Sequence, residues 1–196
     1  MSATRLLILG LVRWVQPVHG YDVRRELLSW HADEWANVAP GSIYHALKKL
    51  AEEGLLREVA TEQVGARPAR TKYEMTEVGE REFQALLRDY WWQYREPVDP
   101  FLAAFGFLPA LPRREAVAAL RNRARTLRGK AEFTRTAIEK GGFDGDEPPH
   151  VLEMFRLMLA RAEVEAQWCD RVADRVEAGE LPSEHDEGQN SSNIQT

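Results

Sequence analysis

The sequence predicts a mainly helical protein in which three helices and a short β-hairpin come first and two long helices come last. Three observations lead to this fold class. Apolar residues recur at spacings of three and four over most of the 196-residue chain, which is the period of an amphipathic helix. Alternation with a period of two is confined to two short runs on either side of residues 65–70. Beyond residue 112, two long helical patterns follow each other around one loop.

Two helices are predicted over residues 4–15 and 21–30. The first is apolar on nearly every side and is therefore expected to be buried. In the second, Tyr21 and Val23 are assigned to the inward face and Arg24 to the outward face. Residues 30–38 are interpreted as a linker in which Trp35 fills the core. The second helix would thus present basic side chains to solvent or to a partner.

A third helix is predicted over residues 40–53, and both of its ends carry clear signals. Pro40 suits a first helical turn because its missing N–H would have no partner there. Gly54 suits the left-handed position that ends a helix. Ile43, Leu47 and Leu50 form one apolar stripe. The stripe leaves the polar and basic side chains on the other faces: Ser42, Tyr44, His45, Lys48 and Lys49.

A two-stranded hairpin is predicted after the third helix, with strands near residues 55–61 and 71–76. Its turn-rich tip carries Arg67 and Arg70, and Lys72 follows in the second strand. Thr76 is then expected to cap a long helix that ends before Pro97. Three helices followed by a hairpin with a basic tip is the order of a winged helix-turn-helix. In that fold the third helix enters the major groove of DNA and the hairpin reaches an adjacent groove or the backbone.

Four segments share a distinctive order and spacing: HGYDV at residues 19–23, PGSIYHALKKL at 40–50, EGLL at 53–56 and KYEMTEVG at 72–79. Together they resemble the signature of the PadR family of transcriptional regulators, in its branch with a larger helical C-terminal domain. The resemblance implies a winged DNA-binding domain, a C-terminal dimerisation domain, and repression of nearby genes that a small molecule relieves. The family often has proline where this chain has His45, so no base preference is carried over to that residue.

The DNA contacts predicted from this fold lie on the second helix, the third helix and the hairpin: Tyr21, Arg24, Ser42, Tyr44, His45, Lys48, Lys49, Arg67, Arg70 and Lys72. The alternative for the lysines and arginines is simple solvation, and for the Tyr21 ring it is a place in the core. Contact is favoured for the cations because the fold places them at the groove.

The second half of the chain is predicted to be a helical dimerisation module. Heptad seams run through residues 113–140 and 150–178, and a loop rich in glycine and proline joins them. Two such helices pack antiparallel, and the wider apolar stripe of the second one calls for a partner subunit. The expected domains are therefore a winged helix-turn-helix over 1–94, a dimerisation and effector domain over 95–179, and a disordered acidic and polar tail over 180–196.

Six tryptophans exceed what a core of this size needs. Trp91 and Trp92 are adjacent, so on a helix they point about 100° apart and cannot both face one core. One hypothesis is that Trp91, Trp92 and Phe105 line a cavity between the domains, where a flat aromatic effector stacks. The alternative is packing at the domain junction and the dimer interface.

The residues that support catalysis or metal binding are sparse. The single cysteine, Cys169, excludes an internal disulfide and a cysteine-based zinc site. The five histidines are scattered, and the sequence has no glycine-rich phosphate loop. No run approaches the roughly 18 apolar residues of a transmembrane helix. We therefore expect a cytoplasmic protein that is not an enzyme and that uses no cofactor, no metal and no membrane.

The charge distribution leaves two functions open. The net charge is −5, and residues 141–196, with four basic and thirteen acidic residues, carry −9. Residues 1–76 have ten basic and nine acidic residues, a net charge of +1. The favoured function is a homodimeric repressor on a palindromic operator, with its two winged domains about 34 Å apart. An activator of the same fold is equally compatible. The near-neutral charge favours the alternative, a winged-helix adaptor that binds proteins and not DNA.

Overall fold

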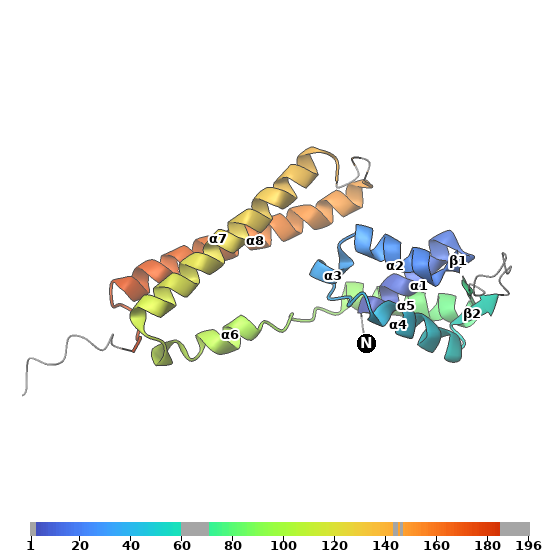
Figure 1. Ribbon diagram of the computed structural model, residues 1–196, viewed down its shortest axis with the longest axis horizontal. Helices are drawn as coiled ribbons and strands as arrows, with labels where there is room; N and C mark the ends of the chain where they lie inside the picture. The colour runs from blue at the N-terminus through green and yellow to red at the C-terminus, as the bar shows by residue number, and fades with distance from the viewer. Residues whose placement is uncertain (1–2, 60–70, 143–144, 146, 185–196) are drawn as a thin grey trace, which may run out of the picture. The chain divides into compact units, whose positions relative to one another are not determined.

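The computed structural model describes residues 3–59, 71–142, 145 and 147–184 (Figure 1). The chain divides into two compact units, Met1–Glu96 and Pro97–Thr196. Each unit has its own hydrophobic cluster. They are described in turn.

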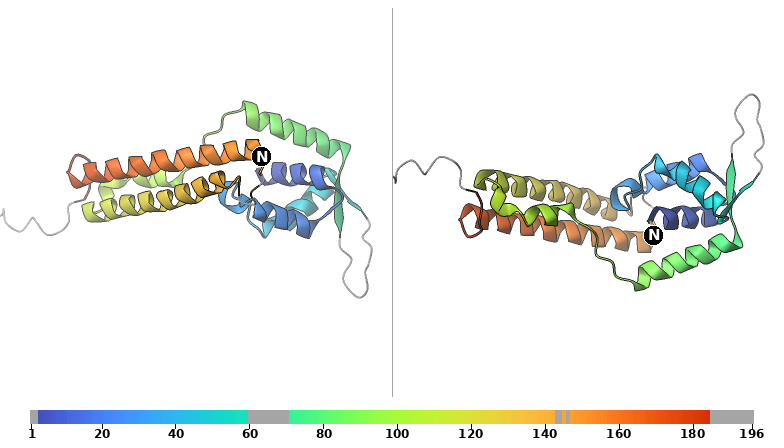
Figure 2. Two further views of the ribbon diagram at one scale, coloured as in Figure 1. Left: turned by 90° about the horizontal axis from the view of Figure 1, so that it is seen from above. Right: turned by 90° about the horizontal axis from the view of Figure 1, so that it is seen from below.

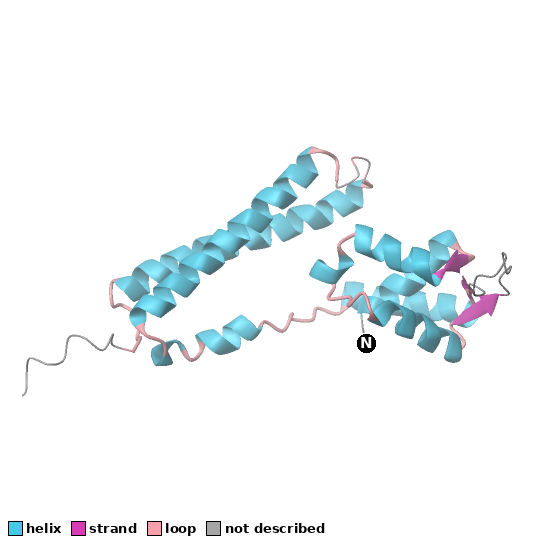
Figure 3. Ribbon diagram, viewed as in Figure 1, coloured by secondary structure: helices cyan, strands magenta, loops and turns pink. Residues whose placement is uncertain are grey.

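The first unit contains five helices and three short strands within its described residues: α1 (Ala3–Val15), β1 (Val18–His19), α2 (Gly20–Ser29), α3 (Ala32–Trp35), α4 (Ser42–Glu52), β2 (Leu56–Val59), β3 (Lys72–Met75) and α5 (Glu77–Trp92). The strands form an antiparallel sheet in the order β1-β3-β2 (Figure 3). The predicted hairpin is therefore present, and β1 adds a third strand to it. At two residues, β1 is too short to show alternation, which is why the sequence pattern did not reveal it.

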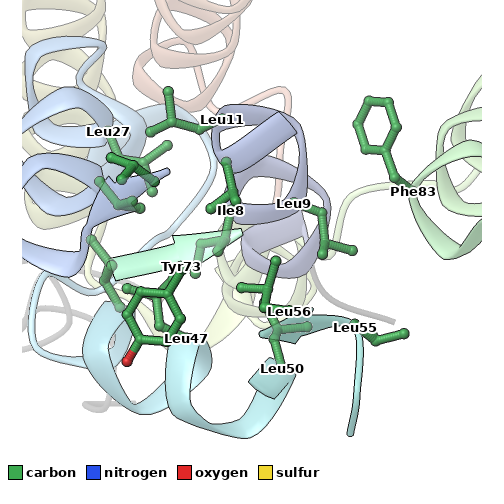
Figure 4. Close-up of a cluster of buried hydrophobic side chains, with 14 of the residues drawn as sticks. Ile8, Leu9, Leu11, Leu27, Leu47, Leu50, Leu55, Leu56, Tyr73 and Phe83 are labelled. Atoms are coloured by element: carbon green, nitrogen blue, oxygen red, sulfur yellow. The ribbon is translucent and has the colours of Figure 1, made fainter. Parts of the chain in front are cut away.

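The core of the first unit surrounds α1. Ile8, Leu9 and Val12 are fully buried there, and α2 and α4 pack against them. Leu47 and Tyr73 bring α4 and β3 into the same cluster (Figure 4). This core orients α4, because its apolar stripe is buried and its polar side chains are left exposed.

The two ends of α4 differ in how well they were predicted. The helix begins at Ser42, so the assignment of Pro40 to its first turn is wrong. Pro40 lies in a tighter turn before the helix, where the Ser42 N–H donates to the Ala39 carbonyl at 2.8 Å. The C-terminal prediction is confirmed, since Gly54 has a φ of +74°. The Leu55 N–H also donates to the Leu50 carbonyl at 2.9 Å, which satisfies an otherwise unpaired helix-end carbonyl.

Two assignments in and after α2 are corrected by the structure. Tyr21 is not inward but 57% exposed, because it lies two residues, or about 200°, before the buried Val23. The predicted linker over residues 30–38 contains the short helix α3. Trp35 packs partly buried against the core, as expected, and its indole N–H donates to the Trp30 carbonyl at 2.7 Å.

The second unit is built on an antiparallel pair of long helices. Its elements are α6 (Pro100–Phe105), the 3₁₀ turn η1 (Leu108–Ala110), α7 (Arg113–Glu139) and α8 (Pro149–Glu177). Helices α7 and α8 lie side by side along their length (Figure 2). Leu120, Ala124 and Cys169 of the predicted seams are buried between them. None of the helices in the described ranges is long and apolar enough to cross a bilayer.

Ion pairs also connect α7 and α8. Arg121, Arg123 and Arg135 of α7 form ion pairs with Asp174, Glu165 and Glu163 of α8, with nitrogen–oxygen distances of 2.5–2.6 Å.

The chain beyond α8 differs from expectation, because residues 180–184 return to the start of α7. There the Glu184 N–H donates to the Leu111 carbonyl at 2.9 Å, so the predicted tail is held at its first residues. The rest of the tail, 185–196, lies outside the described residues.

Candidate nucleic-acid interface

The exposed side of α4 carries five of the predicted DNA-contact residues. All five are exposed: Ser42, Tyr44, His45, Lys48 and Lys49. Lys48 has a loose partner, its Nζ lying 3.7 Å from a Glu52 carboxylate oxygen, and both side chains are mostly exposed. Lys49 has no ion-pair partner among the described residues. The helix therefore presents a hydrated polar face with at least one uncommitted cation.

A groove of about 600 Å³ lies on one flank of α4, where the start of α2 and strand β3 meet it. We call it the tyrosine groove, and it is lined by His19, Gly20, Tyr21, Tyr44, Thr71 and Tyr73. The close packing of α2 against α4 beside this groove depends on Gly20. A Cβ atom on Gly20 would lie 3.3 Å from Leu47 Cδ1 and 3.4 Å from the Tyr44 ring. The start of α2 therefore lies directly against α4.

The walls of the tyrosine groove are joined by contacts between segments distant in sequence. His19 Nδ1 lies 3.4 Å from the Thr71 carbonyl oxygen, across the β1–β3 pair. Burial, with a smaller contribution from the Glu58 carboxylate, raises the pKa of Tyr73. The Tyr73 phenol thus remains a neutral hydroxyl at physiological pH. Tyr73, His19 and Thr71 were not predicted as site residues, because only the sheet pairing brings them to α4.

A second hollow, of about 440 Å³, lies on the opposite flank of α4 and borders α1 and α5. Ser42, His45 and Lys49 contribute to it. Arg5 of α1 also lines it, but ion pairs with Glu53 and Glu82 at 2.5 and 3.2 Å occupy that guanidinium. The predicted contact residues of α4 are thus divided between two flanks, with Tyr44 in the tyrosine groove and Ser42, His45 and Lys49 beside the second hollow.

The remaining predicted contacts are only partly described. Arg24 and Lys72 are half-buried, and neither has an ion-pair partner within the described ranges. Arg67 and Arg70 lie outside the described residues. Arg57 on β2 is a further surface cation, but it is paired across the strands with Glu74.

The three residues predicted to hold an effector do not belong to one unit. Trp91 and Trp92, at the end of α5 in the first unit, are 82% and 83% exposed. Phe105 belongs to the second unit and packs in an aromatic cluster, with its ring centroid 5.1 Å from that of Trp168. The described structure supports an exposed aromatic pair and a separate aromatic cluster.

No group of three metal-ligating side chains lies together within the ranges that the structure describes. Cys169 is buried in the α7–α8 seam, and burial raises the pKa of its thiol. Its surroundings are those of a core thiol.

Comparison with known proteins gives the family of the first unit. The model of the transcriptional regulator PadR-like family matches residues 8–85. No curated protein matches the chain. Among solved structures, Bacillus subtilis PadR in complex with operator DNA is 23% identical, covers 88% of this chain and 98% of its own, and has a TM-score of 0.66.

Two further solved structures share the fold. Bacillus subtilis PadR in complex with p-coumaric acid is 20% identical, with 88% of this chain and 98% of that chain covered and a TM-score of 0.64. The Vibrio cholerae virulence activator AphA is 18% identical, with coverages of 90% and 97% and a TM-score of 0.52. At these identities the likeness shows the fold: a winged helix-turn-helix with a helical C-terminal region. With the family match over residues 8–85, the chain carries a domain of the PadR-like family of transcriptional regulators.

Proposed function

We propose that the protein is a homodimeric, sequence-specific DNA-binding regulator that represses transcription until a small aromatic molecule releases it. The observation that carries the DNA-binding part is the exposed polar face of α4, with Tyr44, His45 and Lys48 outward and Ile43 and Leu47 fully buried. Such a helix fits a major groove, where side chains reach base edges and phosphates. The solved PadR complex with operator DNA supports the same use of this fold.

The chemistry of each side chain indicates which part of the DNA it would contact. Lys48, Lys49 and the cations of the hairpin would neutralise phosphates, which fixes the position of the protein on the duplex. His45 and Ser42 have short hydrogen-bonding groups on the exposed face of α4 and would read base edges. Two copies bound to a palindromic operator would place these helices about 34 Å apart, one turn of DNA.

The test is a titration of labelled DNA with purified protein, after footprinting on the DNA upstream of its own gene. We expect Lys48→Ala and Arg70→Ala each to weaken binding severalfold and to leave the oligomeric state unchanged. Lys130→Ala on α7 and Arg81→Ala on α5 are matched controls, because both residues are exposed and lie outside the proposed interface. Unchanged affinity in both interface variants would contradict the groove assignment.

Release by a ligand is proposed from a different observation. Trp91 and Trp92 are exposed aromatic side chains, and Phe105 belongs to the aromatic cluster of the second unit. A solved structure of this fold contains p-coumaric acid. We expect p-coumaric acid, or another flat aromatic acid, to lower DNA affinity and quench tryptophan fluorescence. Trp91→Phe and Trp92→Phe should weaken that response without changing DNA affinity in its absence.

The alternative function, an adaptor that binds proteins and not DNA, is favoured by the net charge of +1 over residues 1–76. The salt dependence of DNA affinity distinguishes the two functions. Phosphate contacts predict that the logarithm of affinity falls linearly with the logarithm of salt concentration, with a slope of about −0.9 per contact. If the protein is instead an adaptor, we expect no affinity for DNA even at low salt.

A further inference from the structure

Residues 179–184, which we call the strap, return from the end of α8 to the start of α7 (Figure 2). Gly179 begins the return with a φ of +75°, a conformation that favours glycine. The Glu184 N–H donates to the Leu111 carbonyl at 2.9 Å, and the Glu184 carbonyl accepts from the Arg113 N–H at 3.2 Å. The strap therefore pairs with the chain as a short extended segment and satisfies one of the N–H groups at the start of α7.

Two side chains of the strap add to this pairing. Leu181 is partly buried against the hydrophobic cluster of the second unit. The Ser183 hydroxyl lies 3.4 Å from Arg113 Nε, which donates to it. Both partners of the strap, Leu111 and Arg113, belong to the short stretch that joins α6 to α7. The strap thus fixes the place where α6 and η1 lead into α7.

Helix α6 is weakly attached for its own part. None of its six residues is fully buried, and Leu102 is 61% exposed. The rings of Phe101 and Phe105 pack on Trp168, with centroid distances of 6.0 and 5.1 Å. The Arg123 guanidinium covers the Phe101 ring, its Cζ lying 3.9 Å from the ring centre. A helix of this length is not stable alone, so α6 depends on the segments that hold it in place.

Helices α7 and α8 are joined by contacts that do not involve the strap. Ala124 and Cys169 are fully buried between them, and Arg135 pairs with Glu163 at 2.6 Å. Loss of the strap would leave these contacts intact. The strap and α6 therefore form a part of the second unit that can open locally while the helix pair stays folded.

We infer that the strap keeps α6 docked and thereby sets the length of chain that connects the two units. With α6 docked, the seven residues 93–99 connect it to α5. With α6 released, the twenty residues 93–112 separate α5 from α7. The consequence for DNA rests on the proposed homodimeric regulator. A longer connection lowers the effective concentration of the second winged unit at the operator once the first has bound, and so lowers affinity.

The experiment removes one hydrogen bond of the strap. Glu184→Pro lacks the N–H that donates to Leu111, whereas the matched control Glu184→Ala keeps this backbone bond and removes an exposed side chain. A second pair of variants ends the chain at Gly179, which removes the rest of the strap, or at Glu187, which keeps it. Hydrogen exchange followed by mass spectrometry compares residues 100–111 with the middle of α7 and α8. Sedimentation velocity gives the oligomeric state, and fluorescence anisotropy gives the affinity for a duplex selected from random sequence.

We expect Glu184→Pro to raise the exchange rate over residues 100–111 by roughly fivefold, the effect of one hydrogen bond. The chain that ends at Gly179 should show a larger rise. Exchange in the middle of α7 and α8 and the oligomeric state should not change, and both controls should match the unaltered protein. DNA affinity of the chain that ends at Gly179 should fall by roughly fivefold, because effective concentration falls with about the three-halves power of the connecting length.

Unchanged exchange over residues 100–111 in both strap variants would overturn this inference and leave the proposed function standing. An equal rise throughout α7 and α8 would overturn it too, because the strap would then stabilise the whole unit and not α6 in particular. Faster exchange with unchanged DNA affinity would overturn the link between α6 and DNA binding. If the unaltered protein binds no DNA, the proposed function fails, and the exchange rates alone decide whether the strap holds α6.

Discussion

Among the described glycines of the winged unit, Gly79 has the least room for a side chain. It lies in the first turn of α5, where its N–H donates to the hydroxyl of the capping residue Thr76 at 3.0 Å. The same hydroxyl donates to the Gly54 carbonyl at 2.8 Å. A Cβ atom at position 79 would lie 2.0 Å from the Leu55 carbonyl oxygen and 2.6 Å from Met75 Sδ. The close approach of α5 to the chain after α4 therefore requires glycine.

We predict that Gly79→Ala lowers the free energy of unfolding by about 3 kcal/mol, because the atom in the way is backbone and cannot rotate aside. Gly129→Ala is the matched control. Gly129 lies within α7 with nothing within 4 Å of its Cβ position, so alanine there should raise stability by up to about 1 kcal/mol. Urea unfolding followed by circular dichroism measures both changes. Equal effects of the two substitutions would contradict the role given to Gly79.

At the scale of elements, α1 and α5 are joined by the Arg5–Glu82 ion pair near the start of α1, and by an aromatic contact and an exposed ion pair nearer its end. Phe83 of α5 packs against Gly10 of α1, where a Cβ atom would lie 3.1 Å from the ring. Arg13 of α1 lies over the same ring and donates to the Glu80 carboxylate at 2.8 Å. Hydrogen bonds from Arg13 and then from Gln84 lower the pKa of Glu80 below its ordinary value of 4.5.

This ion pair predicts a pH dependence of stability. A carboxyl group with a lowered pKa in the folded state stabilises fully above its unfolded value, and that stabilisation is lost as the pH falls through the lower folded value. Glu80→Gln should therefore destabilise the protein at pH 7 and have no effect in strong acid. Both side chains are more than a third exposed, so the change should stay below about 1 kcal/mol.

Glu77→Gln is the control for the ion pair, because Glu77 shares the first turn of α5 and thus the helix-dipole contribution. Thermal unfolding at several pH values compares the two. If Glu77→Gln and Glu80→Gln lose the same stability at pH 7, the Arg13 contact contributes nothing.

At the scale of the whole molecule, the sequence correctly predicted those features of the fold that depend on residues close together in the chain. The stripe of Ile43, Leu47 and Leu50 and the glycine that ends α4 are local signals, and the structure agrees with both. It did not predict β1, the exposure of Tyr21 or the tyrosine groove. β1 and the groove depend on pairing between segments some 50 residues apart, such as Val18 with Tyr73, which no local pattern encodes. The exposure of Tyr21 follows instead from local helix geometry, because Tyr21 lies about 200° from the buried Val23. Five of the predicted contact residues lie together on α4, whereas the groove walls became visible only in three dimensions.

The proposed homodimer is the prediction that concerns the whole molecule. Several large apolar side chains of the second unit are more than half exposed: Phe133 is 59% exposed, Leu157 51% and Val164 64%. Leu157 and Val164 are seven residues apart on α8 and so share one face, as in a helix that packs against a partner. In a two-fold dimer each substitution counts twice. Loss of one leucine contact of about 2 kcal/mol per subunit thus predicts roughly a thousandfold weaker dimer for Leu157→Glu.

Sedimentation velocity across a concentration series measures this change, with Val78→Glu as the control. Val78 is 50% exposed in the first turn of α5, where a carboxylate is well tolerated, and it lies in the winged unit. We expect the control to remain dimeric and to bind DNA. Leu157→Glu should sediment as a folded monomer and should bind DNA far more weakly, because a monomer brings only one α4 helix to the operator. A monomeric unaltered protein, or an unchanged dimer in Leu157→Glu, would show that this face of α8 is not the interface.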